Sequence, residues 1–452
     1  MKKICFISLG CDKNLVDSEQ MMSILKEAGY GFTDDAASSD AIIINSCCFI
    51  GDAKRESIDE IIEAGRLKEE GNIRFLIVTG CLAERYAEEI KKELPEVDAV
   101  VGTTAFDEIA ALLDALFSES EKDEKRILKK DKDILTNPSV DRLISTPGHY
   151  EYLKIAEGCD KNCTYCIIPK IRGKYRSVPE ERLIKDASLL ADKGVKELIL
   201  VAQETTLYGT DLYGKKTLPS LLGKLSEIPG IERIRLLYCY PEEIDEELIK
   251  AVSELPKVCN YLDIPIQHCS DRILKLMGRR ATKEGITALI KRLRSLIPDI
   301  SIRTTLITGF PGETEEEHRE VLEFVKEMRF DRLGVFTYSP EEGTAAAKLP
   351  GQVEEEVKER RRDETMALQR DISLSINEGF MGKVLSCVIE GYHTEEKVYV
   401  ARSYRDAPDV DGMVFIEGAP DGTLMTGDSV NVRINGFSEY DLQGELTDES
   451  AE

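Results

Sequence analysis

The chain has 452 residues, of which 42% are hydrophobic and 32% are charged, and this size predicts two to four domains with buried cores. It has no run of about 18 apolar residues, and its first residues become polar too soon for a signal peptide, so we expect a cytoplasmic protein without a membrane span. The formal net charge of −25 argues against a nucleic-acid partner held by phosphate neutralisation. It suits a basic protein partner, or simply solubility.

Residues 1–117 alternate short apolar strands with amphipathic helices. Strands are expected at Lys3–Leu9, Ala41–Asn45, Ile73–Thr79 and Val97–Val101. This alternation predicts an α/β fold with a doubly wound parallel sheet. A charge run begins at Ser118, and we interpret residues 118–142 as an exposed linker.

Three cysteines of this first region occupy equivalent positions. Cys11, Cys47 and Cys81 each follow the carboxyl end of a predicted strand, and they are 36 and 34 residues apart, about one strand–helix–strand repeat. Ligands of an open parallel sheet lie beyond the carboxyl ends of its strands, so three thiols distant in sequence should meet there. Unrelated buried thiols are the alternative, but the recurring position favours a shared metal site.

Residues 143–377 alternate strands and helices again. The six expected strands are Tyr152–Ala156, Glu197–Ala202, Arg233–Leu237, Tyr261–Pro265, Ser301–Ile307 and Arg332–Thr337. Six such units predict a partial (β/α) barrel. In residues 378–446 the pattern changes to strands separated by Gly, Asp and Pro turns, which predicts a small β-barrel of the OB type.

A second cysteine triad lies at the end of the barrel's first predicted strand. Cys159, Cys163 and Cys166 fall within eight residues, at the edge where barrel enzymes keep their chemistry. Structural zinc would take four ligands, and the next cysteine is Cys239. Three thiolates on a four-iron cluster would leave one iron open for a ligand.

The three-residue and two-residue spacing of this triad resembles the signature of the radical S-adenosylmethionine superfamily. With the first triad and the β tail, residues 1–446 resemble the methylthiotransferase family. The segments that carry this resemblance to the ribosomal-protein branch are Ser8–Glu19, Tyr261–His268, Gly309–Thr314 and Arg402–Gly412. The resemblance implies an N-terminal methylthiotransferase domain, a radical S-adenosylmethionine domain and a TRAM domain. The family motif has one cysteine where this chain has two, and we assign it to Cys47 rather than Cys48 because Cys47 follows Asn-Ser.

The resemblance also implies two [4Fe–4S] clusters with different tasks. The cluster on Cys159, Cys163 and Cys166 would bind S-adenosylmethionine at its open iron and produce a deoxyadenosyl radical. The cluster on Cys11, Cys47 and Cys81 would present a methylated sulfur to the substrate carbon radical. The protein would supply position and exclusion of water.

Further candidates follow from their location. Gln203 and Glu204 end the second barrel strand and are candidates to accept from the ammonium group of the cofactor. Tyr165 lies inside the cysteine loop and is a candidate to stack on adenine. Gly309 follows the fifth strand and would admit the cofactor close to the backbone. Ordinary packing or capping is the alternative for each of these residues.

The resemblance implies transfer of a methylthio group to the β-carbon of an aspartate in small-subunit ribosomal protein number twelve, with an electron donor such as flavodoxin. A tRNA adenosine methylthiotransferase, a non-catalytic iron–sulfur electron carrier and a zinc-stabilised binding module are the alternatives. Residues 377–452 contain 16 acidic and five basic residues, which argues against direct RNA binding. We expect Asp406, Asp409 and Asp411 to dock the basic ribosomal protein.

Overall fold

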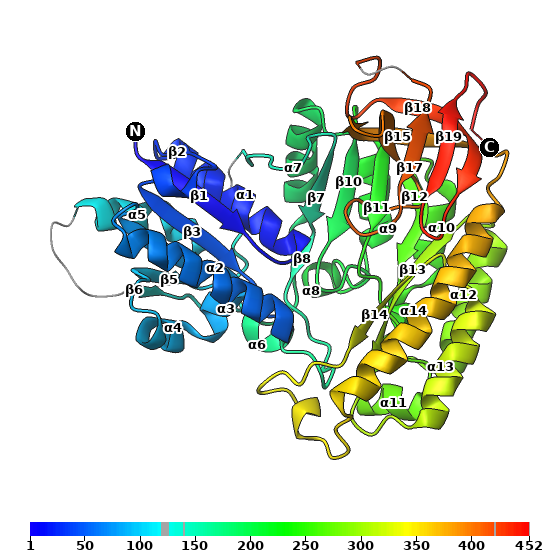
Figure 1. Cartoon of the computed structure of the whole chain (residues 1–452), viewed down its shortest axis with the longest axis horizontal. Coiled ribbons are helices and arrows are strands. Elements are labelled where there is room, and N and C mark those ends of the chain that lie inside the picture. Colours follow the sequence, from blue (N-terminus) through cyan, green and yellow to red (C-terminus); the bar gives the residue numbers. More distant parts are fainter. Residues whose placement is uncertain (119–125, 139–140, 420–421, 452) are drawn as a thin grey trace.

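The computed structural model describes residues 1–118, 126–138, 141–419 and 422–451, which form three parts (Figure 1). A parallel sheet with helices forms the N-terminal part, a six-stranded parallel half-barrel the middle part, and a small closed barrel the C-terminal part. These architectures confirm the predicted fold class. Among the described residues, no helix combines the length and the apolar character that crossing a bilayer requires.

The N-terminal sheet is parallel throughout, with the order β2-β1-β3-β4-β5-β6. Its strands are β1 (Lys3–Ser8), β2 (Gly31–Phe32), β3 (Ala41–Ser46), β4 (Phe75–Thr79), β5 (Ala99–Val101) and β6 (Arg126–Leu128). Helices α2 (Gly51–Glu69), α3 (Gly80–Arg85) and α4 (Ala87–Glu93) cover one face, and α1 (Asp12–Glu27) and α5 (Ile109–Ser118) the other. Ile42 and Ile44 face the first group and Ile43 the second, which is why β3 is an unbroken apolar run.

Part of the predicted linker belongs to this sheet. Residues 119–125 and 139–140 lie outside the described residues, but Arg126–Leu128 pair with Ala99–Val101 as the edge strand β6. The linker prediction is therefore wrong for these three residues. Strand pairing uses backbone hydrogen bonds and does not require apolar side chains. The charged residues before β6 therefore gave no sign that this short strand would follow. The predicted domain boundaries stay predictions.

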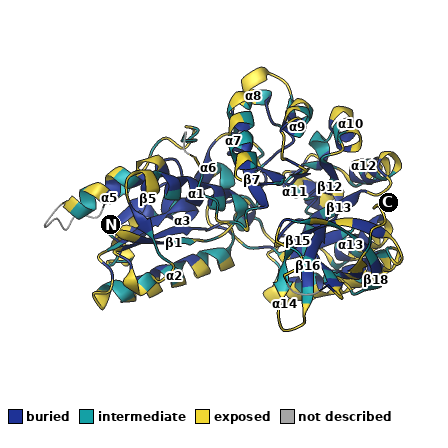
Figure 2. Cartoon of the chain, turned by 90° about the horizontal axis from the view of Figure 1, so that it is seen from above, coloured by how far each residue is buried: buried dark blue, intermediate teal, exposed yellow. Residues whose placement is uncertain are grey.

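The half-barrel is also parallel throughout, with the order β14-β13-β12-β11-β10-β7. Its strands are β7 (Tyr150–Lys154), β10 (Glu197–Val201), β11 (Arg233–Leu236), β12 (Val258–Asp263), β13 (Ser301–Thr308) and β14 (Arg332–Thr337). Its covering helices are α7 (Glu180–Asp192), α9 (Leu218–Ser226), α10 (Glu246–Glu254), α12 (Lys283–Leu296), α13 (Glu315–Met328) and α14 (Glu355–Glu378). The connections contain β8 (Ala156–Glu157), α6 (Ile168–Arg172), β9 (Arg176–Ser177), α8 (Thr210–Tyr213) and α11 (Asp271–Leu276). Figure 2 shows the buried strands inside helices whose outer faces are exposed. The sheet contains all six expected strands, so this prediction is confirmed.

The C-terminal part is a closed five-stranded barrel with the order β15-β16-β17-β19-β18. Its strands are β15 (Val384–His393), β16 (Val398–Ser403), β17 (Val414–Glu417), β18 (Ser429–Phe437) and β19 (Leu442–Leu446). Alternate side chains from all five strands, such as Leu385 and Ile434, fill its interior. The small β-barrel is thus confirmed, with β19 as a strand that the sequence pattern did not indicate.

The acidic tail motif that we expected to dock a partner is largely buried inside the molecule. Asp406 is 1% exposed and accepts a hydrogen bond from Arg332 Nε at 3.2 Å. Asp411 accepts from the Tyr261 hydroxyl at 2.7 Å. Of the three aspartates only Asp409 is exposed. The docking prediction is therefore wrong for Asp406 and Asp411, because a segment that reads as an exposed acidic turn finds its partners on the inner face of the half-barrel.

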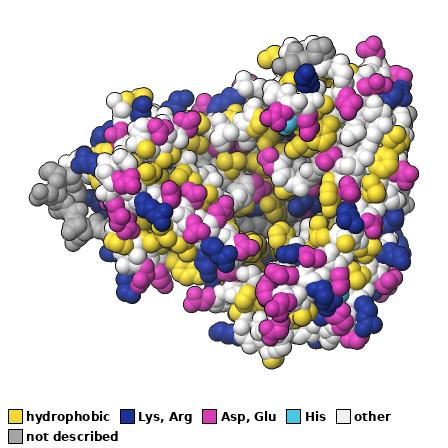
Figure 3. Space-filling model, in the orientation of Figure 1, with side chains coloured by type: hydrophobic (Ala, Val, Ile, Leu, Met, Phe, Trp, Pro, Cys, Tyr) yellow, Lys and Arg dark blue, Asp and Glu magenta, His cyan; other side chains and the backbone are white. Residues whose placement is uncertain are grey.

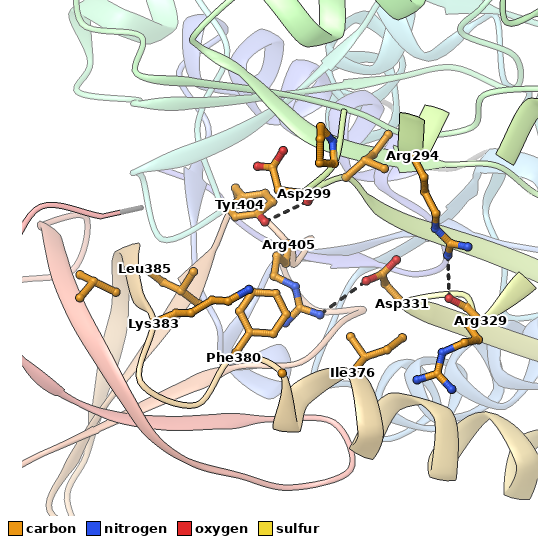
Figure 4. Close-up of a pocket in the computed structure, with 14 residues that line it drawn as sticks. Arg294, Asp299, Arg329, Asp331, Ile376, Phe380, Lys383, Leu385, Tyr404 and Arg405 are labelled. Carbon is orange, nitrogen blue, oxygen red and sulfur yellow. Dashed lines mark hydrogen bonds and ion pairs between the residues drawn. The ribbon is translucent and has the colours of Figure 1, made fainter. Parts of the chain in front are cut away.

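A pocket of about 600 Å³ lies at the seam between the two barrels (Figure 4). Arg405 reaches across the seam to Asp331 at 3.7 Å, and the Tyr404 hydroxyl donates to the Asp299 carbonyl at 2.9 Å. Asp299 precedes β13, so the pocket lies at the amino end of the strands, whereas the cysteine loops follow carboxyl ends. The charged groups that line the seam join the two barrels. We therefore do not interpret this pocket as a catalytic site.

Replacing Asp406 with Ala should lower the free energy of unfolding by about 3–5 kcal/mol, because Arg332 would stay buried without its carboxylate. Urea unfolding followed by circular dichroism measures this change. Glu395→Ala, at an exposed position of the same barrel, is the matched control and should stay within about 0.5 kcal/mol of the unmodified chain. Equal effects of the two substitutions would contradict the buried pairing.

Candidate active site

Strands β1, β3 and β4 end side by side in the N-terminal sheet. Their register places Ser8, Asn45 and Thr79 in one row across the sheet. The predicted first triad follows this row within three residues of it: Cys11, Cys47 and Cys81. Because the loops after parallel strands lie at one edge, the structure brings these three cysteines to a common edge.

Two glycines let these loops approach each other. Gly10 has φ +89°, and a Cβ at this position would lie 2.6 Å from the Cβ and 2.8 Å from the Sγ of Cys47. Gly80 has φ +90°, and a Cβ there would overlap the carbonyl oxygen of Ser46. Any side chain would push the loops apart. Cys48 is fully buried and packs in the core beneath α2, α3 and α4, so Cys47 is the neighbour that meets the Gly10 loop.

The carboxyl edge of the half-barrel meets this cysteine edge. In Figure 1, β1 runs towards the half-barrel. The Tyr238 hydroxyl, just beyond β11, donates to Asp12 Oδ1 at 3.2 Å, and Asp12 directly follows Cys11. Lys13 Nζ lies 3.3 Å from the centre of the Tyr238 ring. Figure 3 shows the surface hollowed between the two parts, with acidic and basic side chains interspersed over this face.

The second predicted triad lies on the loop between β8 and α6. Its members are Cys159, Cys163 and Cys166. The Thr164 amide donates to the Met277 carbonyl at 2.9 Å, and the Ala346 amide donates to the Thr164 carbonyl at 2.8 Å. The Lys161 amide donates to Cys159 Sγ at 3.4 Å. Neighbouring segments therefore fix this loop at the carboxyl end of the half-barrel.

Both triads offer thiols, which are the ligands that iron–sulfur clusters take. Burial raises the pKa of Cys47 and Cys81, and it raises the pKa of Cys159 and Cys166 to about 12. Such thiols lose their protons when they bind a metal. Among the described residues, no three His, Cys, Asp or Glu side chains converge closely enough for one ion. A four-iron cluster spreads its thiolates over separate irons, and a structural zinc site would take four ligands.

Two buried oxygens at the end of β10 have no hydrogen-bond donor among the described residues: Gln203 Oε1 and Glu204 Oε2. The Gln203 amide nitrogen donates to Glu157 at 2.7 Å. Lys161 Nζ of the cysteine loop lies 3.9 Å from Glu204 Oε2. Burial raises the pKa of Glu204 to about 7. Buried acceptors that lack a hydrogen-bond donor suit a ligand group that carries only donors, such as an ammonium.

The other two predicted cofactor residues have packing partners within the chain. Tyr165 packs with Met277 and Phe310 in a small apolar cluster. A Cβ at Gly309, which has φ +71°, would overlap the Lys358 side chain. The absence of a side chain at Gly309 therefore makes room for Lys358 of helix α14. The roles of Tyr165 and Gly309 towards a cofactor stay predictions.

Sequence reasoning missed a buried arginine beside the second triad. Arg279 is 6% exposed, and within the described part of the chain its Nε and Nη1 have no hydrogen-bond acceptor. Its guanidinium lies 4.2 Å from the ring centre of Tyr240, whose hydroxyl is 3.8 Å from Cys163 Sγ. Two free donors on a buried cation suit an anionic ligand group. The Arg279-Arg280 pair gave no signal, because surface arginine pairs look the same in sequence.

Three family models match the chain in succession. They are the uncharacterized protein family UPF0004 over residues 3–102, the radical SAM superfamily over residues 153–325, and the TRAM domain over residues 381–447. The first covers the sheet with the first triad, and the second covers most of the half-barrel with the second triad.

Curated relatives match over nearly the whole chain. The ribosomal protein uS12 methylthiotransferase RimO of Lachnoclostridium phytofermentans is 54% identical and covers 98% of this chain and 99% of its own. The proteins of the same name from Acetivibrio thermocellus and Clostridioides difficile are 51% and 49% identical, cover 100% of this chain, and are themselves covered to 99% and 100%.

Solved structures share the fold at low identity. The radical S-adenosylmethionine methyltransferase TsrM from Kitasatospora setae has a TM-score of 0.54 at 14% identity, over 85% of this chain and 78% of its own. The cobalamin-dependent S-adenosylmethionine radical enzyme OxsB has a TM-score of 0.52 at 14% identity, over 82% and 56%. These likenesses concern the arrangement of the sheets.

Replacing Glu204 with Gln should stabilise the metal-free chain at pH 8 by up to about 3 kcal/mol, because the pKa of this carboxyl is about 7 in the fold and about 4.5 when unfolded. The unfolded chain ionises first as pH rises, so the wild-type penalty is absent below about pH 4.5 and complete above pH 7. The gain should therefore shrink as pH falls from 8 to 5. Thermal unfolding midpoints across this range measure it, and a gain independent of pH would contradict the raised pKa.

Proposed function

Since this chain belongs to the RimO family of ribosomal protein uS12 methylthiotransferases, we propose that it transfers a methylthio group to the β-carbon of an aspartate in uS12. It is a radical S-adenosylmethionine enzyme. The observation that carries the proposal is the meeting of two cysteine edges, that of the N-terminal sheet and that of the half-barrel, joined by Tyr238 and Asp12.

The six cysteines would hold two clusters. Cys159, Cys163 and Cys166 would hold one, and Cys11, Cys47 and Cys81 the other, because each set offers three thiols and leaves one iron open. When bound, the first cluster and S-adenosylmethionine supply a deoxyadenosyl radical, and the second cluster supplies the sulfur.

Side chains around the second triad would orient the cofactor. The buried oxygens of Gln203 and Glu204 would accept hydrogen bonds from an ammonium, and the Glu204 carboxylate would add a charge once it is ionised above pH 7. The free donors of Arg279 would bind a carboxylate. The barrel wall behind them is buried, which keeps bulk water away from the reacting groups.

The partner would be the basic protein uS12 rather than RNA, and the reaction would take place in the cytoplasm with an electron donor such as flavodoxin. The excess of acidic residues in the C-terminal barrel supports a basic partner. The surface of Figure 3 carries mixed charges, so the hollow between the two parts, rather than one acidic patch, is where we expect the substrate loop to enter.

Anaerobic reconstitution should load roughly eight irons per chain, about four at each triad. A Cys159, Cys163, Cys166→Ala variant should keep about half of the iron and form no deoxyadenosine. Iron analysis and liquid chromatography measure both quantities. Cys48→Ala is the matched control for Cys47→Ala and should keep the full iron content. Loss of all iron in the triple variant would show that the first triad is not an independent site.

Reconstituted enzyme with S-adenosylmethionine and a reductant should add a methylthio group to uS12, as measured by peptide mass spectrometry. Replacing the modified aspartate of uS12 with Asn should abolish the added mass, because the β-carbon is then bonded to an amide instead of a carboxylate. Modification of tRNA without modification of uS12 would overturn the assignment and favour the tRNA adenosine methylthiotransferases. Absence of both products with normal deoxyadenosine formation would also count against it.

A further inference from the structure

Four buried charged side chains and one buried amide connect the two cysteine edges. The residues are Asn14 and Asp17 of α1, Lys154 of β7, Glu157 of β8 and Arg172 of α6. Each of the five is at most 8% exposed. Lys154 binds Asp17, and it lies 2.9 Å from Glu157. Arg172 Nη1 lies 2.7 Å from Asp17 and 3.1 Å from Glu157. One end of this network is therefore on helix α1 of the N-terminal part, and the other is two residues before Cys159.

Arg172 extends the network to the first triad through Asn14. Its Nη2 donates to Asn14 Oδ1, and the Cys81 thiol donates to the same oxygen at 3.8 Å. The Asn14 amide nitrogen donates to the carbonyls of Leu9 at 3.0 Å and Ser46 at 3.1 Å. Leu9 lies in the loop that leads to Cys11, and Ser46 directly precedes Cys47. A single amide thus touches all three cysteine loops, and the arginine fixes its orientation.

Arg172 also brings a positive charge to the first triad. Its guanidinium and the Cys81 thiol share Asn14 Oδ1 as a hydrogen-bond acceptor. The two cations of the network, Lys154 and Arg172, are balanced by Asp17 and Glu157. Cysteine thiols that lose their protons on binding a cluster add negative charge at the first triad. This charge would face the positive charge of Arg172 in a region shielded from water.

We propose that Arg172 is a positioning residue for the sulfur-presenting site: it orients Asn14 against the three cysteine loops and supplies the positive charge that the bound cluster faces. This inference rests on the proposed function only in taking Cys11, Cys47 and Cys81 to hold an iron–sulfur cluster. Through Glu157 the same guanidinium fixes that site relative to the loop of Cys159. Arg172 lies in the connection between β8 and β9 of the half-barrel. This one side chain therefore contacts both the part that carries the first triad and the part that carries the second.

The test uses the full chain with Cys159, Cys163 and Cys166 replaced by Ala, so that only the first site is loaded. In this background Arg172→Gln should shift the midpoint potential of the cluster to a more negative value, because a positive charge nearby favours the reduced form. Arg172→Lys keeps the charge and should restore much of the potential. Redox titration followed by electron paramagnetic resonance measures the shift.

Arg235→Gln is the matched control. Arg235 is also buried and pairs with Glu197 at 2.8 Å. It contacts Tyr404 at the amino end of the half-barrel, whereas the cysteine loops lie at the carboxyl end. The Arg235→Gln substitution should destabilise the chain about as much as Arg172→Gln, and it should leave the midpoint potential of the cluster unchanged. An equal shift with Arg235→Gln, or no shift with Arg172→Gln while iron is retained, would overturn the inference. Iron loss with Gln but not with Lys would support it, and iron loss with both would overturn it.

In the otherwise unmodified chain, Arg172→Gln should raise the ratio of deoxyadenosine formed to uS12 modified by several-fold, since Cys159, Cys163 and Cys166 are all retained while the sulfur is displaced. An unchanged ratio would count against the inference. The two proposals fail differently. If the first site holds no iron even with Arg172 present, both fail, whereas iron with an unshifted potential removes only the role of Arg172.

Discussion

The burial of paired charges where α1 meets the half-barrel constrains the rest of the molecule. Taking an ion out of water costs several kcal/mol, and this cost is offset only when partners of opposite charge are in place with good geometry. Asp17, Lys154 and Arg172 meet this condition together in one arrangement of the two parts. The cysteine loops belong to different parts, so they take their relative position from this contact.

At its amino end, the half-barrel depends on the C-terminal part of the chain. Six strands leave an interior that they cannot close by themselves, and the chain fills the amino end with the segment after β16. Arg235 donates to the Tyr404 carbonyl at 2.7 Å, and the Ser301 hydroxyl donates to the Arg405 carbonyl at 3.1 Å. The C-terminal barrel is therefore part of the packing of the half-barrel rather than an appended module. The end that remains for a substrate is the one that faces the cysteines.

The sequence predicted what depends on local patterns and on parallel-sheet geometry. The recurrence of Cys11, Cys47 and Cys81 just after apolar strands was enough to predict one common edge, because register in a parallel sheet converts position along the chain into position in space. It did not predict what depends on distant partners. Asp406 looked exposed because its partner Arg332 lies 74 residues away. Arg172 and Arg279 carry no local motif, and only the fold shows that each is buried beside a cysteine loop. Strand β6 was hidden because its neighbours in sequence are charged.

The row formed by Ser8, Asn45 and Thr79 has a consequence for maturation of the enzyme. Strands β1, β3 and β4 must all pair before Cys11, Cys47 and Cys81 lie at one edge, so the first site does not exist in a nascent or partly folded chain. The second triad spans eight residues of a single loop, so its thiols come together without the pairing of distant strands. Assembly of the first triad therefore depends on completion of the N-terminal sheet, whereas the second triad needs only its own loop.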